Sequence, residues 1–110
     1  MSDILRDLYA IVENRRAERE EGSYTNYLFE SGLDKILKKL GEEEAETLIA
    51  AKNLELNNEA IKEREELKNE VSDLLYHLVV MLNELGVRPE EIEEVLRARM
   101  QKKGNLKKSE

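Results

Sequence analysis

Aliphatic residues recur three and four positions apart along most of this chain, and little in the sequence interrupts that spacing. Its 110 residues include only five glycines and one proline, while charged residues make up 39% and aromatic residues 5%. A spacing of three and four places apolar side chains on one face of an α-helix. The sequence therefore predicts an all-α fold with an aliphatic core, in a chain of the length of one domain.

Five helices are predicted from this spacing and from the residues that start and end helices. Ser2 or Asp3 can cap the first helix, and Gly86 suits the left-handed position that follows a helix. Pro89 fits a first helical turn, where its missing amide is harmless. We expect the third helix to continue through Gly41, because the apolar residues before and after it keep the same phase. The predicted helices cover about residues 2–18, 25–32, 33–56, 59–85 and 89–100.

Each helix carries apolar residues that we expect to be buried in one domain, residues 1–100, and residues 101–110 form a polar tail that we expect to fray. The apolar residues are Ile4, Leu8, Ile11 and Val12; Leu28 and Phe29; Leu33, Ile36, Leu37, Leu40, Ala45, Leu48 and Ile49; and Ile92, Val95, Leu96 and Met100. In the fourth helix, residues 74–82 are apolar nearly all the way round, which calls for cover on several sides. We therefore expect homodimerisation to complete the helix bundle, as a dimer or a dimer of dimers.

Charge and cysteine content exclude several classes of function. The net charge is −7, and a chain this acidic is a poor candidate for binding nucleic acid. The absence of cysteine excludes disulfides, thiolate zinc sites and cysteine nucleophiles. The first residues lack the pattern of a signal peptide, and no apolar run is long enough to cross a bilayer. We expect a cytoplasmic protein without a membrane or nucleic-acid partner.

Two groups of acidic residues lie beside the apolar stripes rather than opposite them. On the third helix, Glu46 lies roughly 40° and Glu43 roughly 100° from Glu42 around the axis, so the three share one side. On the fourth helix, Glu70 and Asp73 are three residues apart. Packing the two stripes together would gather these carboxylates in a partly desolvated space, where they repel each other. Mg²⁺ or Mn²⁺ would relieve the repulsion, because both ions prefer oxygen ligands.

Lysines precede these acids on the same helix face. Lys35, Lys38 and Lys39 fall within roughly 60° of Glu42 if the helix is unbroken. The face from Lys35 to Glu46 then spans about 16 Å, a length suited to a polyphosphate that reaches a metal. The alternative is that the acids are solvated and pair weakly with the lysines four residues away, and spacing alone leaves both interpretations open.

Short motifs surround these acids and lysines. They are Gly22-Ser23-Tyr24-Thr25, Leu28-Phe29, Gly32, Lys35-Ile36, Lys38-Lys39-Leu40-Gly41-Glu42-Glu43, Glu46, Ala50-Ala51-Lys52 and Glu70-Val71-Ser72-Asp73-Leu74-Leu75-Tyr76-His77. Together they resemble the phosphoribosyl-ATP pyrophosphohydrolase family of histidine biosynthesis, over nearly the whole chain. The acidic motifs alone mark the wider all-α NTP pyrophosphatase (MazG-like) superfamily. Glu44 and Thr47 depart from the family pattern, which has a small and an aliphatic residue there.

The resemblance implies hydrolysis of the α–β phosphoanhydride of phosphoribosyl-ATP to phosphoribosyl-AMP and pyrophosphate, with Mg²⁺ or Mn²⁺ as a substitute. Because the sequence has no cysteine and only one histidine, we expect a metal-activated water to be the nucleophile. The implied metal ligands are Glu43, Glu46, Glu70 and Asp73, and the implied catalytic acids are Glu42 and Glu43. The implied substrate contacts are Lys35, Lys38 and Lys39, while Ser23, Tyr24 and Thr25 either cap a helix or contact ribose or phosphate.

Two alternative functions and the role of one histidine remain undecided from the sequence. The chain could be a house-cleaning (d)NTP pyrophosphatase of the same superfamily, or a helical adaptor without catalytic activity. His77, which is the only histidine, is either a packed, hydrogen-bonded residue or an additional metal ligand.

Overall fold

A computed structural model of the chain describes residues 3–57, 60–102 and 106–107, and within these ranges it contains five α-helices and no strand. The helices are α1 (Ile4–Ala17), α2 (Tyr24–Ser31), α3 (Leu33–Leu56), α4 (Ile61–Leu85) and α5 (Pro89–Met100). The predicted all-α class and the five helices are thereby confirmed. In the described part of the chain, no helix combines the length and the apolar character needed to cross a membrane.

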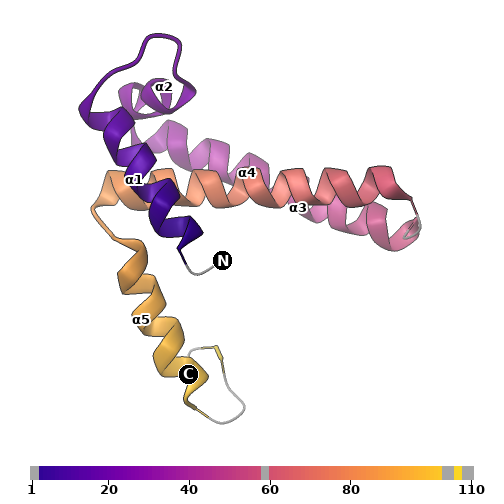
Figure 1. The fold of residues 1–110 in the computed structure, drawn as a ribbon. Coiled ribbons are helices and arrows are strands. Elements are labelled where there is room, and N and C mark those ends of the chain that lie inside the picture. Colours follow the sequence, from indigo (N-terminus) through magenta and orange to yellow (C-terminus); the bar gives the residue numbers. More distant parts are fainter. Residues whose placement is uncertain (1–2, 58–59, 103–105, 108–110) are drawn as a thin grey trace.

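The two longest helices, α3 and α4, run side by side in opposite directions as a hairpin (Figure 1). Near one end of the hairpin, α1 packs across α4, and α2 joins α1 to α3. The last helix, α5, turns away from the hairpin at the end of α4 and contacts α1. The opposite end of the hairpin therefore extends beyond the other helices.

The core lies where α1 and α2 meet the hairpin. Its fully buried side chains are Val12, Leu28, Ile36 and Val80, one from each of the first four helices. The predicted burial of the first three is confirmed. Tyr9 is buried in α1 as well, whereas Ile4 and Ile11 are exposed, so the prediction for those two isoleucines was wrong.

Several other apolar residues predicted to be buried are exposed in the single chain. In α5, exposure ranges from 42% at Ile92 to 70% at Met100, because this helix diverges from α4 instead of lying along it. In α3, the exposed residues include Leu48 and Ile49, which lie in the second half of the helix. The same correction applies to Leu37, Val95 and Leu96.

Helix ends follow the sequence signals closely. Gly86 has φ 74° and donates its amide to the Asn83 carbonyl, as expected of a left-handed cap. Ser23 caps α2 by accepting from the Asn26 amide at 3.3 Å. Of the two alternative caps predicted for the first helix, Asp3 makes no side-chain cap bond. The predicted start of the fourth helix at residue 59, the Ser2 cap and most of the predicted tail lie outside the described residues.

Two glycines should respond to alanine in opposite directions. Gly41 lies inside the unbroken helix α3, and a Cβ there would have nothing within 4 Å, so Gly41→Ala should raise the free energy of unfolding by about 1 kcal/mol. Gly86→Ala should lower it by about 1 kcal/mol, because φ 74° is strained for alanine. Urea denaturation of both variants tests this, and changes of equal sign would contradict the helix assignment.

Candidate metal centre

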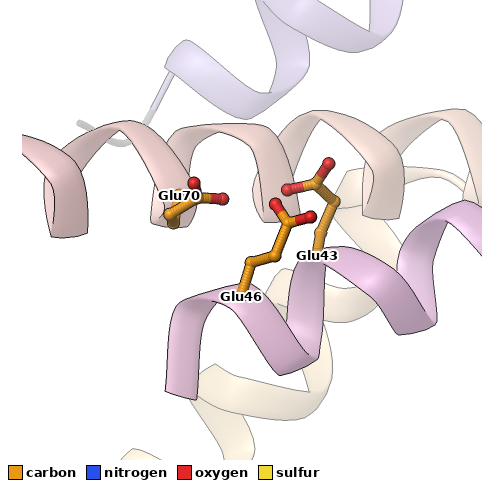
Figure 2. A group of neighbouring side chains, drawn as sticks. All are labelled: Glu43, Glu46 and Glu70. Carbon is orange, nitrogen blue, oxygen red and sulfur yellow. The ribbon is translucent and has the colours of Figure 1, made fainter. Parts of the chain in front are cut away.

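Three carboxylates meet across the α3–α4 hairpin (Figure 2). Glu43 and Glu46 project from successive turns of α3, and Glu70 projects toward them from α4. One oxygen atom from each of the three lies within 4.8 Å of the others. Oxygens gathered at this spacing can bind one hard cation together.

Thr47 ties the two helices together beside these carboxylates. Its hydroxyl lies 2.8 Å from the Glu43 carbonyl oxygen on its own helix and 3.3 Å from the Glu70 carbonyl oxygen on α4. The single hydroxyl proton is shared between these two acceptors. An aliphatic residue has no hydroxyl and could not donate this hydrogen bond to the Glu70 carbonyl oxygen of α4. Sequence reasoning noted Thr47 as a departure from the family pattern but gave no signal of this role.

The cluster is electrostatically costly without a cation. One carboxylate oxygen of Glu43 and one of Glu70 is buried without a hydrogen-bond partner in the described structure. Burial raises the pKa of Glu43, and the charges of Glu46 and Asp73 raise it further. The neighbouring Glu46 carboxyl raises the pKa of Glu70 to about 7, because a proton on Glu70 can be shared with it, and burial and the Glu46 charge add to this shift. These residues fit a divalent cation that would take the place of the proton.

Two further acids that the sequence grouped with these three lie outside the cluster. Glu42 is exposed and forms an ion pair with Lys39 at 3.4 Å. Asp73 is also exposed and is not among the three carboxylates that meet, although its charge acts on Glu43. Glu42 therefore does not join Glu43 and Glu46 in one pocket as predicted, because it lies roughly 100° from Glu43 around the helix and pairs with Lys39 instead.

Two lysines of α3, Lys35 and Lys39, lie near the tyrosines of α2. The ammonium group of Lys35 stands 6.0 Å from the centre of the Tyr27 ring. Lys39 is held by Glu42, and its charge also acts on Tyr24. Lys38 is exposed. The observed ion pair joins residues three apart, rather than the four expected for Lys38–Glu42 or Lys39–Glu43.

The Ser23-Tyr24-Thr25 motif contacts α4 instead of standing free. Ser23 caps α2, while the Thr25 hydroxyl bonds to the Tyr76 hydroxyl. The Tyr24 hydroxyl lies 2.9 Å from Nε2 of His77, which is buried. His77 is thus packed and hydrogen-bonded, and in the described residues it is not one of the group that could hold a metal.

Comparison with known proteins agrees with the motif resemblance. The model of the phosphoribosyl-ATP pyrophosphohydrolase family matches residues 5–100. The phosphoribosyl-ATP pyrophosphatase of Streptococcus thermophilus is 52% identical over 103 residues, which are 94% of this chain and 91% of that protein. That of Pelotomaculum thermopropionicum is 52% identical over 101 residues, 92% of this chain and 95% of that protein. The histidine biosynthesis bifunctional protein HisIE of Thermoanaerobacter pseudethanolicus is 50% identical over 91 residues, 83% of this chain and 38% of that protein.

Glu70→Gln should make the metal-free protein more stable than the wild type, increasingly so as the pH rises from 5 to 8. The wild-type Glu70 has a pKa of about 7 in the folded chain against an ordinary 4.5, so the folded state holds an extra proton in this window and loses stability as the pH rises. Glutamine removes that dependence. Thermal unfolding in EDTA across this pH range measures the difference.

The matched control is Glu66→Gln, which removes an exposed carboxylate one turn earlier on α4 that pairs with Lys62 at 4.0 Å. The stability of Glu66→Gln relative to the wild type should not increase as the pH rises. A stability difference between Glu70→Gln and the wild type that stays constant from pH 5 to 8 would contradict the shared proton.

Proposed function

We propose that this chain, which belongs to the phosphoribosyl-ATP pyrophosphohydrolase family, hydrolyses the α–β phosphoanhydride of phosphoribosyl-ATP to phosphoribosyl-AMP and pyrophosphate. This is the second step of histidine biosynthesis, and we expect it to take place in the cytoplasm, where nucleotides and Mg²⁺ are available. The relatives' names support the substrate. The observation in this chain that carries the proposal is the cluster of Glu43, Glu46 and Glu70.

We propose Mg²⁺ as the cofactor, with Mn²⁺ as a substitute. Glu43, Glu46 and Glu70 would hold the ion, and Asp73, one turn along α4 from Glu70, would complete the set as a fourth carboxylate. Support comes from the donor chemistry, which is entirely oxygen, and from the two buried carboxylate oxygens without partners. When bound, the ion would neutralise phosphate charge and lower the pKa of an attacking water.

The remaining polar residues have tasks that follow from their charges. Lys35, Lys38 and Lys39 would bind phosphate oxygens and hold the polyphosphate in line with the attacking water. In the hydrolysis, the water oxygen bonds to phosphorus, the bond to the leaving pyrophosphate breaks, and one proton leaves the water. Glu42 and Glu43 are the carboxylates that we expect to accept it. Lys39 would exchange its partner Glu42 for a phosphate when substrate binds, which frees that carboxylate.

We further propose that two copies of the chain form a dimer through the face where α5 diverges from α4. An open groove of about 630 Å³ lies there, and its lining is almost entirely apolar, including Leu5, Leu82, Ile92, Leu96 and Met100. Three of these residues are also among the exposed apolar side chains of α5. A second copy would present the same stripe, so the two faces can cover each other.

Pyrophosphate release from phosphoribosyl-ATP tests the activity, with ATP, dUTP and dCTP as competing substrates. We expect turnover that requires Mg²⁺, stops in EDTA and prefers phosphoribosyl-ATP. Glu46→Gln and Glu70→Gln should each lower kcat/KM by at least about 100-fold, because both remove a metal ligand. The Glu66→Gln control should keep wild-type activity. Preference for a free nucleotide would indicate a house-cleaning pyrophosphatase, and no turnover at all a helical adaptor.

Leu96→Glu should convert the dimer into a monomer, because it would bury a charge in the apolar groove face. Sedimentation velocity measures the change. Leu56→Glu, at the far end of α3 and 75% exposed in the wild type, is the control that should leave the assembly unchanged. A wild-type chain that sediments as a monomer would contradict the proposed dimer.

A further inference from the structure

Two neighbouring hydroxyl groups in the first turn of α2 form hydrogen bonds with α4. Tyr24 bonds to His77 and Thr25 bonds to Tyr76, so consecutive residues of one helix meet consecutive residues of the other. His77 makes a second contact, between its Nδ1 and the Asp73 carbonyl oxygen at 2.7 Å. Both ring nitrogens of this buried histidine are therefore occupied, and the ring links Tyr24 to the turn of α4 that carries Asp73.

The chemistry of these contacts fixes where the protons lie. A carbonyl oxygen can only accept, so Nδ1 of His77 carries a proton and donates it to Asp73. In the neutral ring Nε2 is then unprotonated and accepts the hydroxyl proton of Tyr24 at 2.9 Å. Since His77 is only 5% exposed, packing holds the ring in this orientation.

The Tyr24 oxygen consequently faces its surroundings only as an acceptor. Tyr24 is 44% exposed and close enough to the metal centre for the charges of Glu43 and Lys39 to act on it. Phosphate oxygens near neutral pH are themselves acceptors, so Tyr24 cannot hydrogen-bond to them while it donates to His77. A hydroxyl or amino group of a nucleoside is a donor and can bond to this oxygen. Ser23 and Thr25 are already engaged in other contacts.

We propose that His77 is a positioning residue that holds the Tyr24 hydroxyl oxygen as a hydrogen-bond acceptor for the nucleoside part of the substrate. The inference rests on the proposed function for the identity of the nucleotide. It separates the roles around the metal centre, with lysines for the phosphates and Tyr24 for a donor group of the ribose or the base. Because ribose hydroxyls and the base amine share this donor chemistry, either can be the bonded group.

The tautomer of His77 can be measured without substrate. His77 is the only histidine, so the two imidazole nitrogen signals in a ¹⁵N NMR spectrum belong to it. We expect Nδ1 to carry the proton and Nε2 to be an acceptor, and we expect Tyr24→Phe to move the Nε2 signal more than the Nδ1 signal. A proton on Nε2, or an Nε2 signal that does not respond to Tyr24→Phe, would overturn the inference.

Binding of the two products, measured by titration calorimetry with Mg²⁺ present, tests the assignment to the nucleoside. Tyr24→Phe should weaken the binding of phosphoribosyl-AMP by about tenfold, which is the order of one hydrogen bond. The affinity for pyrophosphate should stay within twofold of the wild type. His77→Asn, which is too short to reach Tyr24, should have the same effect, whereas the longer His77→Gln can still accept from Tyr24 and should recover most of the affinity. Tyr24→Phe changes a half-exposed side chain, so its result stands even if the His77 variants fail to fold.

The control is Tyr76→Phe, which removes the other hydroxyl contact between α2 and α4. If the hydroxyl contacts only hold α2 against α4, Tyr76→Phe should weaken the binding of phosphoribosyl-AMP as much as Tyr24→Phe does. That result would overturn the inference. Weakened pyrophosphate binding in Tyr24→Phe would overturn it as well. If a ribose hydroxyl is the bonded group, the 2′- or 3′-deoxy analogue of phosphoribosyl-AMP that lacks it should bind the wild type and Tyr24→Phe with equal affinity. If both analogues still bind the wild type more tightly, the base amine is the bonded group. Failure of the wild type to hydrolyse phosphoribosyl-ATP would instead contradict the proposed function, and neither the tautomer nor the product binding depends on turnover.

Discussion

Repulsion among the three carboxylates held between α3 and α4 is the interaction on which the rest of this structure depends. Two long helices packed side by side bring one carboxylate oxygen each of Glu43, Glu46 and Glu70 within 4.8 Å of one another. At neutral pH the helices can hold this charge together by sharing a proton or by binding a cation. The same helices that build the core therefore also build the carboxylate cluster that we propose to hold a divalent ion.

Around the cluster, we propose that lysine charges bind the phosphates of the substrate and that a neutral hydroxyl forms a hydrogen bond with its nucleoside. Lys35 and Lys39 stand beside α2 on the same side of the hairpin, where they can neutralise phosphates. The Tyr24 hydroxyl, fixed by His77, adds a neutral acceptor next to them. The groups that we propose to bind the substrate thus come from helices rather than from loops, so packing sets their positions before any ligand arrives.

Local signals in the sequence were enough to predict much of this architecture. Helical spacing, the cap at Gly86 and the matching phase on both sides of Gly41 depend only on neighbours in the chain, and each prediction was confirmed. Position around one helix axis is also local, which is why Glu43, Glu46 and Glu70 were found. What periodicity cannot supply is the direction in which a neighbouring helix lies. Glu42 and Asp73 therefore looked equivalent to their neighbours, although both lie outside the group of three.

The remaining errors also have non-local causes. The apolar stripe of α5 was expected to be buried, but its burial depends on which way the chain turns after Gly86 and on what covers the groove. The Tyr24–His77 bond joins residues 53 positions apart, so spacing alone could not reveal it. The role of Thr47 depends likewise on a backbone oxygen of the opposite helix. Contacts of this kind appear only when two elements are placed together.

The most direct test of the central claim is anomalous scattering from crystals soaked in Mn²⁺. We expect a strong peak between the Glu43, Glu46 and Glu70 carboxylates, within about 2.0–2.4 Å of an oxygen from each, the usual range for a hard divalent cation. No peak there in crystals where Mn²⁺ supports turnover, or a strong peak at another site alone, would contradict it.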